Sequence, residues 1–486
     1  MSATYAAPAD TSTSQPASKP ANPTSRVVLA SLIGTTIEFY DFYVYATAAV
    51  LVFPALFFPT ADPRTAMLAS FATFGAAMLA RPFGAMLFGH LGDKHGRKTT
   101  LIASLLTMGI ATFLIGLLPT YALIGVAAPF LLLVLRLCQG FALGGEWSGA
   151  ALVATENAPK GKRAWFGTFP QVGAPIGFII ANGLFLAINF LLPNHSDPTA
   201  RSAEFLAYGW RIPFLFSAVM VIIGLWVRMH LVESESFRRA QRHGAVKRVP
   251  LAEAFQKNWR QLILGTFAML ATYVLFYLMT TFTLTFGTTA SSAAAAKASA
   301  AKAGKAFDPS TFVPGLGFKY TDFVLLMCIS IVFFGVFTLI SGPLADKIGR
   351  KWLVLWTTLA LIAFGFAFPL FLNANGDPKF TGAMTMAFLV IGFTLMGLTF
   401  GPMGALLPEM FPTNTRYTGS AFAYNISSIL GAAVAPMIAV ALWGLGNGST
   451  VWVGMYLVAM SVITAVSLLF TKETKDTDVY ELDEID

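Results

Sequence analysis

Long, continuous runs of apolar residues alternate with short polar segments along almost the whole chain. A helix needs about 20 mostly apolar residues to cross the hydrocarbon core of a bilayer. The runs lack the strict alternation of apolar and polar residues that marks the strands of a membrane barrel. The pattern therefore predicts an all-α membrane protein with twelve spanning helices, which we place at residues 28–57, 64–90, 99–118, 121–154, 164–192, 211–231, 261–288, 320–345, 352–373, 381–408, 416–443 and 450–471.

Composition and the placement of charge agree with this pattern. Hydrophobic residues make up 56% of the 486 residues and charged residues only 12%, whereas soluble domains carry about 25% charged residues. The net charge of +8 does not indicate a nucleic-acid partner, because most Lys and Arg residues lie in short segments between apolar runs, at 90–98, 156–163, 228–260 and 346–351. Such segments face the cytoplasm. We expect a bacterial inner-membrane protein in a lipid bilayer, with both termini cytoplasmic.

A polar string that occurs twice indicates an internal repeat. "GHLGDKHGRK" at 89–98 and "GPLADKIGRK" at 342–351 are identical at seven of ten positions, with an offset of 342 − 89 = 253. The same offset relates a second pair of loops, in which Glu156, Pro159 and Arg163 correspond to Glu409, Pro412 and Arg416. Chance similarity between apolar helices would not align two charged loops. The chain is therefore predicted to consist of two six-helix halves related as parallel repeats.

The repeat and the composition divide the chain into five segments. We expect a disordered cytoplasmic tail at 1–25, a six-helix bundle at 26–231, a basic cytoplasmic linker at 232–260, a second six-helix bundle at 261–471 and an acidic cytoplasmic tail at 472–486. An Ala- and Lys-rich stretch at 291–310 falls on the outer side. Its composition predicts a mobile or weakly helical excursion.

The repeated string places matching acidic and basic residues at one end of each half. Each aspartate can approach the positive end of a neighbouring helix, and each arginine has a glutamate partner in the following loop. These bonds would hold the halves closed on the cytoplasmic side and break when the halves rock apart. The alternative is that the charges only set topology. The candidate gate consists of Asp93, Arg97, Glu156, Arg163, Asp346, Arg350, Glu409 and Arg416.

The doubled string resembles the signature of the major facilitator superfamily. Further motifs, in order, resemble the metabolite:proton symporter family within it: "EFYDFY" (38–43), "ARPFGA" (80–85), "RLCQGFALGGEW" (136–147), "TENAP" (155–159) and "WRIPF" (210–214). The resemblance covers roughly residues 26–472. It implies two six-helix bundles around a central cavity that work by alternating access. It also implies proton-coupled movement of organic acids, betaines or aromatic acids.

Ionisable residues inside spanning helices are costly and mark candidate functional sites. Glu38 and Asp41 lie three residues apart and share a helix face, with Tyr45 four residues beyond Asp41. Two neighbouring carboxylates in a low dielectric do not both ionise cheaply, so one would bind a proton. The proton-coupling candidates are Glu38, Asp41, Arg136 and Glu146; the resemblance also links Arg136 to proton transfer. The alternative is a static network in which arginines neutralise both acids.

Arg81 is the candidate for binding a substrate anion, because its guanidinium matches a carboxylate. It precedes Pro82, which kinks a helix and frees a carbonyl group. The rival interpretation pairs Arg81 only with internal carboxylates. Four uncharged residues are further candidates for substrate contact, with packing as their alternative role: Tyr45, Tyr273, Tyr277 and Asn425.

Together these features predict a secondary transporter that imports a small metabolite, expected to be an organic acid, with protons. No Gly-rich phosphate loop is present to bind ATP, and no spacing of His or Cys indicates a metal site, so we expect no cofactor. We expect a monomer and no enzymatic activity. The alternatives are a uniporter or exchanger of the same fold or, from other classes, an intramembrane enzyme or a membrane sensor.

Overall fold

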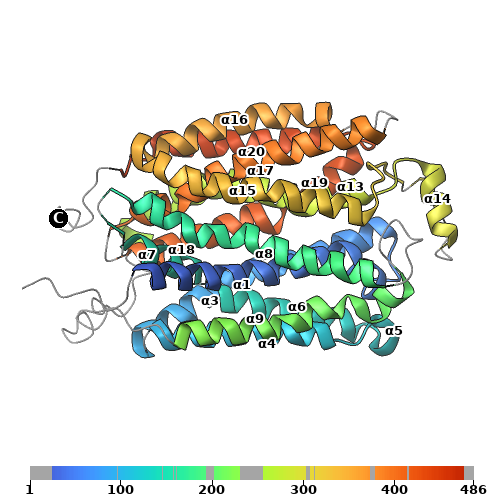
Figure 1. Cartoon of the computed structure of the whole chain (residues 1–486), viewed down its shortest axis with the longest axis horizontal. Coiled ribbons are helices and arrows are strands. Elements are labelled where there is room, and N and C mark those ends of the chain that lie inside the picture. Colours follow the sequence, from blue (N-terminus) through green and yellow to red (C-terminus); the bar gives the residue numbers. More distant parts are fainter. Residues whose placement is uncertain are drawn as a thin grey trace, which may run out of the picture.

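The computed structural model describes residues 24–95, 97–144, 146–156, 158–159, 161–192, 202–229, 255–302, 307–310, 312–372, 378–412 and 415–475. These residues form long helices that run nearly parallel to one another, and they contain no β-strand (Figure 1). Most of the predicted N-terminal tail, linker and acidic C-terminal tail lies outside the described residues, so those assignments stay predictions.

All twelve predicted spans correspond to long helices, some of them built from consecutive pieces. The first half contains α1 (Thr24–Leu51), the short α2 (Phe53–Leu56), α3 (Pro63–His95), α4 (Arg97–Leu117), the short α5 (Tyr121–Ile124), α6 (Ala127–Leu143), α7 (Glu146–Glu156), α8 (Arg163–Leu191), the π-helix η1 (Phe205–Gly209) and α9 (Arg211–Met229). The pairs α6–α7 and η1–α9 each make one span.

The second half repeats this order. It contains α12 (Trp259–Tyr277), the π-helix η2 (Leu278–Phe282), α13 (Thr283–Thr288), α14 (Ala293–Lys302), α15 (Tyr320–Ile348), α16 (Arg350–Phe371), α17 (Pro378–Glu409), α18 (Arg416–Ser427), the π-helix η3 (Ser428–Ala433), α19 (Ala435–Leu445) and α20 (Val451–Phe470). The pieces α12–η2–α13 and α18–η3–α19 each form one continuous span. Part of the Ala- and Lys-rich stretch, Ala293–Lys302, forms the ten-residue helix α14.

Ten helical spans within the described residues are long and apolar enough to cross a membrane. The first helix, α1, is not among them, and the apolar part of α4 is shorter, at Ile102–Leu117. Polar and acidic residues lower the hydropathy of α1, among them Glu38 and Asp41. Both acids are buried. A helix whose polar residues face the protein interior satisfies the requirement that lipid sees only apolar groups.

The helix ends preserve the repeat that the sequence predicts. Arg97 and Arg350 begin α4 and α16, and Arg163 and Arg416 begin α8 and α18. Both pairs differ by 253, since 350 − 97 = 253 and 416 − 163 = 253. Helix neighbours repeat as well: α3 packs on α6 as α15 packs on α17, and α4 packs on α9 as α16 packs on α20. The two six-helix halves are therefore built alike.

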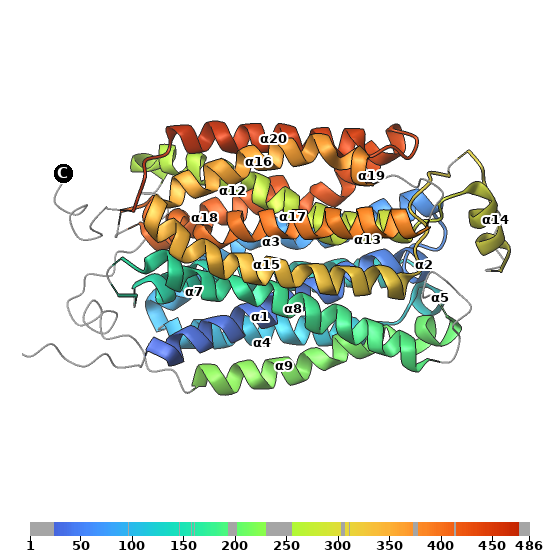
Figure 2. The same ribbon diagram turned by 45° about the horizontal axis from the view of Figure 1, so that its top comes forward.

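The two halves lie side by side, and α8 and α15 run along their boundary (Figures 1 and 2). On the other side of the boundary, α3 packs against α18 and η3. We call the end where α1 begins and α20 ends the terminal end. The opposite end, from which α14 projects in Figure 2, is the α14 end. Both α1 and α12 run from the terminal end towards the α14 end.

Candidate functional site

The two acids of α1 are buried and bind different partners. Glu38 is 1% exposed and Asp41 is 2% exposed. Glu38 Oε1 lies 3.4 Å from Arg81 Nη2 of α3 and forms an ion pair with it. Asp41 Oδ2 accepts a hydrogen bond of 2.9 Å from the Thr112 hydroxyl of α4. Each acid is therefore tied to its own neighbouring helix.

A chain of hydrogen bonds links Asp41 to Arg136 through two neutral side chains. Gln139 Nε2 donates to Thr112 Oγ1 over 2.6 Å, and Arg136 Nη1 donates to Gln139 Oε1 over 2.9 Å. Sequence reasoning missed Thr112 and Gln139. The sequence did contain a sign of Gln139's role, because this polar residue lies three positions after Arg136, which was predicted to be buried.

Aromatic rings hold Arg136 in the interior. Its guanidinium carbon lies 4.1 Å from the ring centroid of Tyr45, 4.7 Å from that of Phe42 and 4.9 Å from that of Phe74. Its Nε donates to the Phe74 carbonyl over 3.4 Å. Within the described residues Arg136 forms no ion pair. Ring faces attract a cation but do not neutralise it. The carboxylate to which hydrogen bonds connect Arg136 is Asp41, through Gln139 and Thr112.

Arg81 shares one of these rings. Its guanidinium carbon lies 4.6 Å from the centroid of Phe42, which therefore contacts both buried arginines. Arg81 Nε has no hydrogen-bond partner among the described residues. The fourth coupling candidate, Glu146, is buried in the first turn of α7, where the helix dipole favours a carboxylate.

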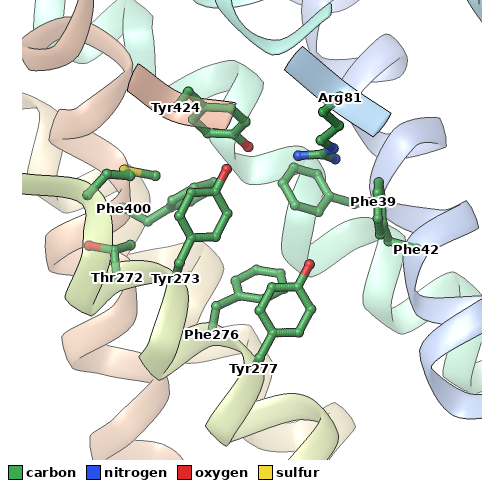
Figure 3. Close-up of a pocket in the computed structure, with 10 residues that line it drawn as sticks. Phe39, Phe42, Arg81, Thr272, Tyr273, Phe276, Tyr277, Phe400 and Tyr424 are labelled. Atoms are coloured by element: carbon green, nitrogen blue, oxygen red, sulfur yellow. The ribbon is translucent and has the colours of Figure 1, made fainter. Parts of the chain in front are cut away.

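A central cavity lies between the two halves, and Arg81 is the charged residue among the ten described residues that line it (Figure 3). Its empty volume is about 340 Å³. In Figure 3 the hydroxyl groups of Tyr273 and Tyr424 point towards each other and towards Arg81. We call this the ring cavity, because aromatic side chains supply most of its wall: Phe39, Phe42, Tyr273, Phe276, Tyr277, Phe400 and Tyr424.

The structure brings three of the five predicted substrate residues to the ring cavity, namely Arg81, Tyr273 and Tyr277. Tyr45 is not among the lining residues; its hydroxyl donates to Thr73 over 2.8 Å. Asn425 instead donates from Nδ2 to the Gly144 carbonyl over 2.6 Å, a bond that joins the two halves. Tyr424, next to it, lines the cavity and stacks on Trp147, with centroids 3.9 Å apart.

At the terminal end, Asp346 binds across the boundary between the halves. Its carboxylate accepts hydrogen bonds from the backbone N–H groups of Ala164 (3.1 Å) and Trp165 (3.0 Å), at the start of α8. Arg350 Nη2 lies 3.1 Å from Asp346 Oδ1, and Arg350 Nε lies 3.3 Å from Glu409 Oε2. The structure thus forms the Arg350–Glu409 pair that the sequence suggested.

The corresponding group in the first half is only partly visible. The side chains of Asp93 and Arg97 lie outside the described residues, while Glu156 is exposed at the end of α7. Arg163 begins α8. Its counterpart in the second half, Arg416, begins α18, and its Nε donates to the Phe411 carbonyl over 3.2 Å. A gating role for the residues of either half stays a prediction.

Sequence reasoning missed a short segment after α20 that contacts the terminal end. Glu473 accepts hydrogen bonds from the backbone N–H groups of Arg350 (2.9 Å) and Lys351 (3.0 Å). The hydroxyl of Thr474 donates to Glu409 over 2.6 Å. Glu473 therefore binds the start of α16 in the way that Asp346 binds the start of α8. An acidic tail gives no sign of this role without the fold.

Known proteins resemble this chain in sequence and in fold. Residues 27–249 and 307–485 match the family described as "Sugar (and other) transporter". The inner membrane metabolite transport protein YhjE of Escherichia coli K12 is 50% identical over 460 residues, with 94% of this chain and 96% of that one covered. The shikimate transporter of the same organism is 35% identical over 453 residues, with 93% and 95% covered. The solved structure of the proton:xylose symporter XylE from E. coli, bound to 6-bromo-6-deoxy-D-glucose, has a TM-score of 0.65 at 17% identity, with 95% of this chain and 98% of that one covered.

Proposed function

Because the chain belongs to the major facilitator superfamily and to its metabolite transporters, we propose that it imports a small organic acid together with protons. The observation that carries this proposal is the balance of buried charge. Two carboxylates, Glu38 and Asp41, face two guanidinium groups, Arg81 and Arg136, across the contacts described above. These four groups are neutral together when all are ionised. Glu146, the third buried acid, is counted apart from them, because the first turn of α7 stabilises its charge.

An organic anion that enters the ring cavity upsets this balance. Its carboxylate would bind Arg81, whose Nε is available and whose bond to Glu38 is long, at 3.4 Å. The site then carries one surplus negative charge in a low dielectric, which is strongly unfavourable. A proton on Glu38 or Asp41 removes the surplus. Charge balance thus makes movement of the anion depend on movement of a proton.

Asp41 is our choice for the residue that carries the proton. It forms no ion pair with any described residue, whereas Glu38 is paired directly with Arg81. Its protonation leaves the Thr112–Gln139–Arg136 chain intact, because a protonated carboxyl group still accepts a hydrogen bond on its second oxygen. The rival hypothesis, a static network, predicts that Asp41 stays ionised throughout the cycle.

The shape of the ring cavity limits the substrate. Arg81 is the single positive group in its described lining, and aromatic rings form most of the remainder. One carboxylate therefore finds a partner there, and the rest of the molecule packs on rings. The shikimate transporter is a relative at 35% identity, so shikimate is a reasonable first probe.

We further propose that the terminal end faces the cytoplasm. Arg350, Lys351 and Lys475 gather there, and basic residues accumulate on the cytoplasmic side of membrane proteins. The bonds of Asp346 to α8 close this end. At the α14 end, Arg64 of α3 donates to the Ala441 carbonyl of α19 over 3.3 Å. The halves touch at both ends, which suits an occluded state of an alternating-access cycle.

The decisive experiment compares Asp41→Asn with the wild type in proteoliposomes. A thermal-shift panel of shikimate, benzoate, succinate and glycine betaine first selects the ligand that stabilises the protein most. With an acidic exterior, the wild type should accumulate that ligand against its gradient, and Asp41→Asn should lose accumulation but keep exchange of internal for external ligand. The matched control is Asp322→Asn, an exposed acid in the first turn of α15.

Two results would contradict the proposal. Full uphill uptake by Asp41→Asn excludes Asp41 as the coupling residue and favours the static network. Wild-type uptake that only equilibrates the ligand, with no response to the proton gradient, identifies a uniporter or exchanger.

A further inference from the structure

A second cavity lies beyond the ring cavity, towards the α14 end. Its empty volume is about 200 Å³. On α1 it begins at Tyr43, one residue after Phe42 of the ring cavity, and on the seventh span it begins at Thr280, three residues after Tyr277. Both spans run towards the α14 end. At 1.5 Å per residue, the second cavity is displaced by roughly 6–12 Å in that direction.

Neutral polar side chains give this second cavity its character. We call it the hydroxyl cavity, from Tyr43, Thr47, Asn182, Thr280 and Thr281 in its lining. The hydroxyl groups of Tyr43 and Thr281 are buried, and neither has a hydrogen-bond partner among the described residues. An unpaired buried donor is costly, and each such group calls for a partner. Two unpaired, uncharged donors in the lining of one cavity can serve the oxygens of a carboxylate or the water that it displaces.

A pair of aromatic rings divides the two cavities. Tyr43 lines the hydroxyl cavity and Phe276 lines the ring cavity. Their rings stack, with centroids 5.6 Å apart and planes 20° apart. Phe178 supports Tyr43 from the side at 4.9 Å. A ring is about 3.5–4 Å thick in van der Waals contact, so we expect this stacked pair to obstruct movement between the two cavities unless one of the rings turns away.

The local backbone allows such a movement. The π-helix η2 begins at Leu278, two residues after Phe276, and passes through Thr280 and Thr281. π-helical turns carry a looser hydrogen-bond pattern and occur preferentially at functional sites. A change in η2 would move Phe276 and the hydroxyl of Thr281 together.

We propose that the hydroxyl cavity is a second station for the carboxylate of the substrate, and that the Tyr43–Phe276 pair is the gate between the two stations. The carboxylate first displaces water from the neutral donors of the hydroxyl cavity. It then passes the gate to Arg81, whose positive charge binds it more strongly. The order of the stations, weak before strong, draws the anion inward. The anionic identity of the ligand rests on the proposed function; the gate itself does not.

Cysteine reactivity tests the gate without any substrate. In a variant whose Cys138 and Cys328 are replaced by Ser, Thr281→Cys reports on the hydroxyl cavity and Thr272→Cys on the ring cavity. Right-side-out vesicles are treated with the anionic, membrane-impermeant reagent 2-sulfonatoethyl methanethiosulfonate. Asp322→Cys, exposed at the α14 end, shows whether that end faces the reagent.

Thr281→Cys should react at least about tenfold faster than Thr272→Cys. Adding Phe276→Ala should raise the Thr272→Cys rate about tenfold by opening the gate. Phe364→Ala, which removes a buried ring of α16 packed on Phe388, should leave the rate unchanged. Equal rates for the two reporters, or no response to Phe276→Ala, would overturn the gate.

Protection by carboxylates tests the station. The reporter here is Leu284→Cys, which lines the hydroxyl cavity and keeps both unpaired hydroxyl groups. Benzoate, shikimate or succinate should slow its reaction when Arg81→Gln disables the ring cavity, and benzyl alcohol should not. Tyr43→Phe keeps the ring but removes the hydroxyl, so it should weaken this protection about tenfold. Absence of protection by all three acids overturns the station. These readouts need no transport, so they fail or succeed independently of the Asp41→Asn experiment.

Discussion

The Thr112 hydroxyl contacts three neighbours, namely Asp41, Gln139 and, at 3.0 Å, the Met108 carbonyl of its own helix. It donates to Asp41 and accepts from Gln139, so it orients the carboxylate that we assign to proton binding and the amide that leads to Arg136. It touches neither the ring cavity nor the hydroxyl cavity. Its role is therefore positioning, which separates it from residues that bind substrate.

Thr112→Val is expected to uncouple substrate uptake from proton movement, although it removes no charge. Valine keeps the shape but removes the hydroxyl that Gln139 Nε2 and Asp41 Oδ2 each contact, at a cost of about 1–3 kcal/mol per unsatisfied atom. The melting temperature should fall by several degrees, and uphill uptake should fall more than exchange. Thr112→Ser keeps the hydroxyl and should resemble the wild type. If Val and Ser variants behave alike in both assays, the hydrogen-bond chain has no role in coupling.

At the scale of single residues, the sequence identifies buried charged residues more readily than it identifies the aromatic residues that line a cavity. Arg81 and Asp41 stand out because an ionisable group inside an apolar run is costly, and Asp346 stands out because it belongs to the polar string that occurs twice. Phe276 and Phe400 do not stand out among 44 phenylalanines. Whether a ring faces lipid, core or cavity is decided by packing between helices that are distant in the sequence.

Close contact between α3 and α6 sets the spacing of the two buried arginines. A Cβ atom at Gly140 would overlap the Ala77 carbonyl, and one at Gly144 would overlap the Arg81 carbonyl. Gly140 follows Arg136 by four residues, and Ala77 precedes Arg81 by four. The contact therefore lies within one turn of each arginine, as expected for small residues at membrane helix interfaces.

Gly140→Ala should separate these helices and disturb both stability and transport. Overpacking of this kind costs about 1–3 kcal/mol, and displacement of Arg136 should reduce uphill uptake further. Gly183→Ala on α8 is the matched control, because nothing lies within 4 Å of the Cβ position there. Thermal unfolding in detergent and proteoliposome uptake measure the two effects. Equal melting temperatures for the two alanine variants would contradict a packing role for Gly140.

Element order and most helix ends follow from local signals, namely apolar runs and the repeated loops. The π-helices η2 and η3 have no such signal, although they interrupt the seventh and eleventh spans. Their extra residue per turn depends on what packs against the helix. Fold class was thus readable from the sequence, whereas the bends that shape the cavities were not.

At the scale of the whole molecule, two carboxylates hold helix starts together at the terminal end. Asp346 joins the second half to α8 of the first half, and Glu473 joins the segment after α20 to α16. Only the first of these bonds crosses the boundary between halves. Rocking of the halves must therefore break the Asp346 contact, while the Glu473 contact moves with the second half as a unit.

Asp346→Ala should shift the protein towards a conformation open at the terminal end. Loss of a carboxylate cap costs about 0.5–2 kcal/mol, which changes an equilibrium roughly 2- to 30-fold. Ala405→Cys reports the change, since Ala405 is buried beside Ala164. In the background without Cys138 and Cys328, its alkylation by N-ethylmaleimide should accelerate within that range. Asp322→Ala removes the same charge from the other end of α15 and should have no effect. An unchanged rate in Asp346→Ala would mean that apolar packing of α8 on α15, and not the carboxylate, keeps this end closed.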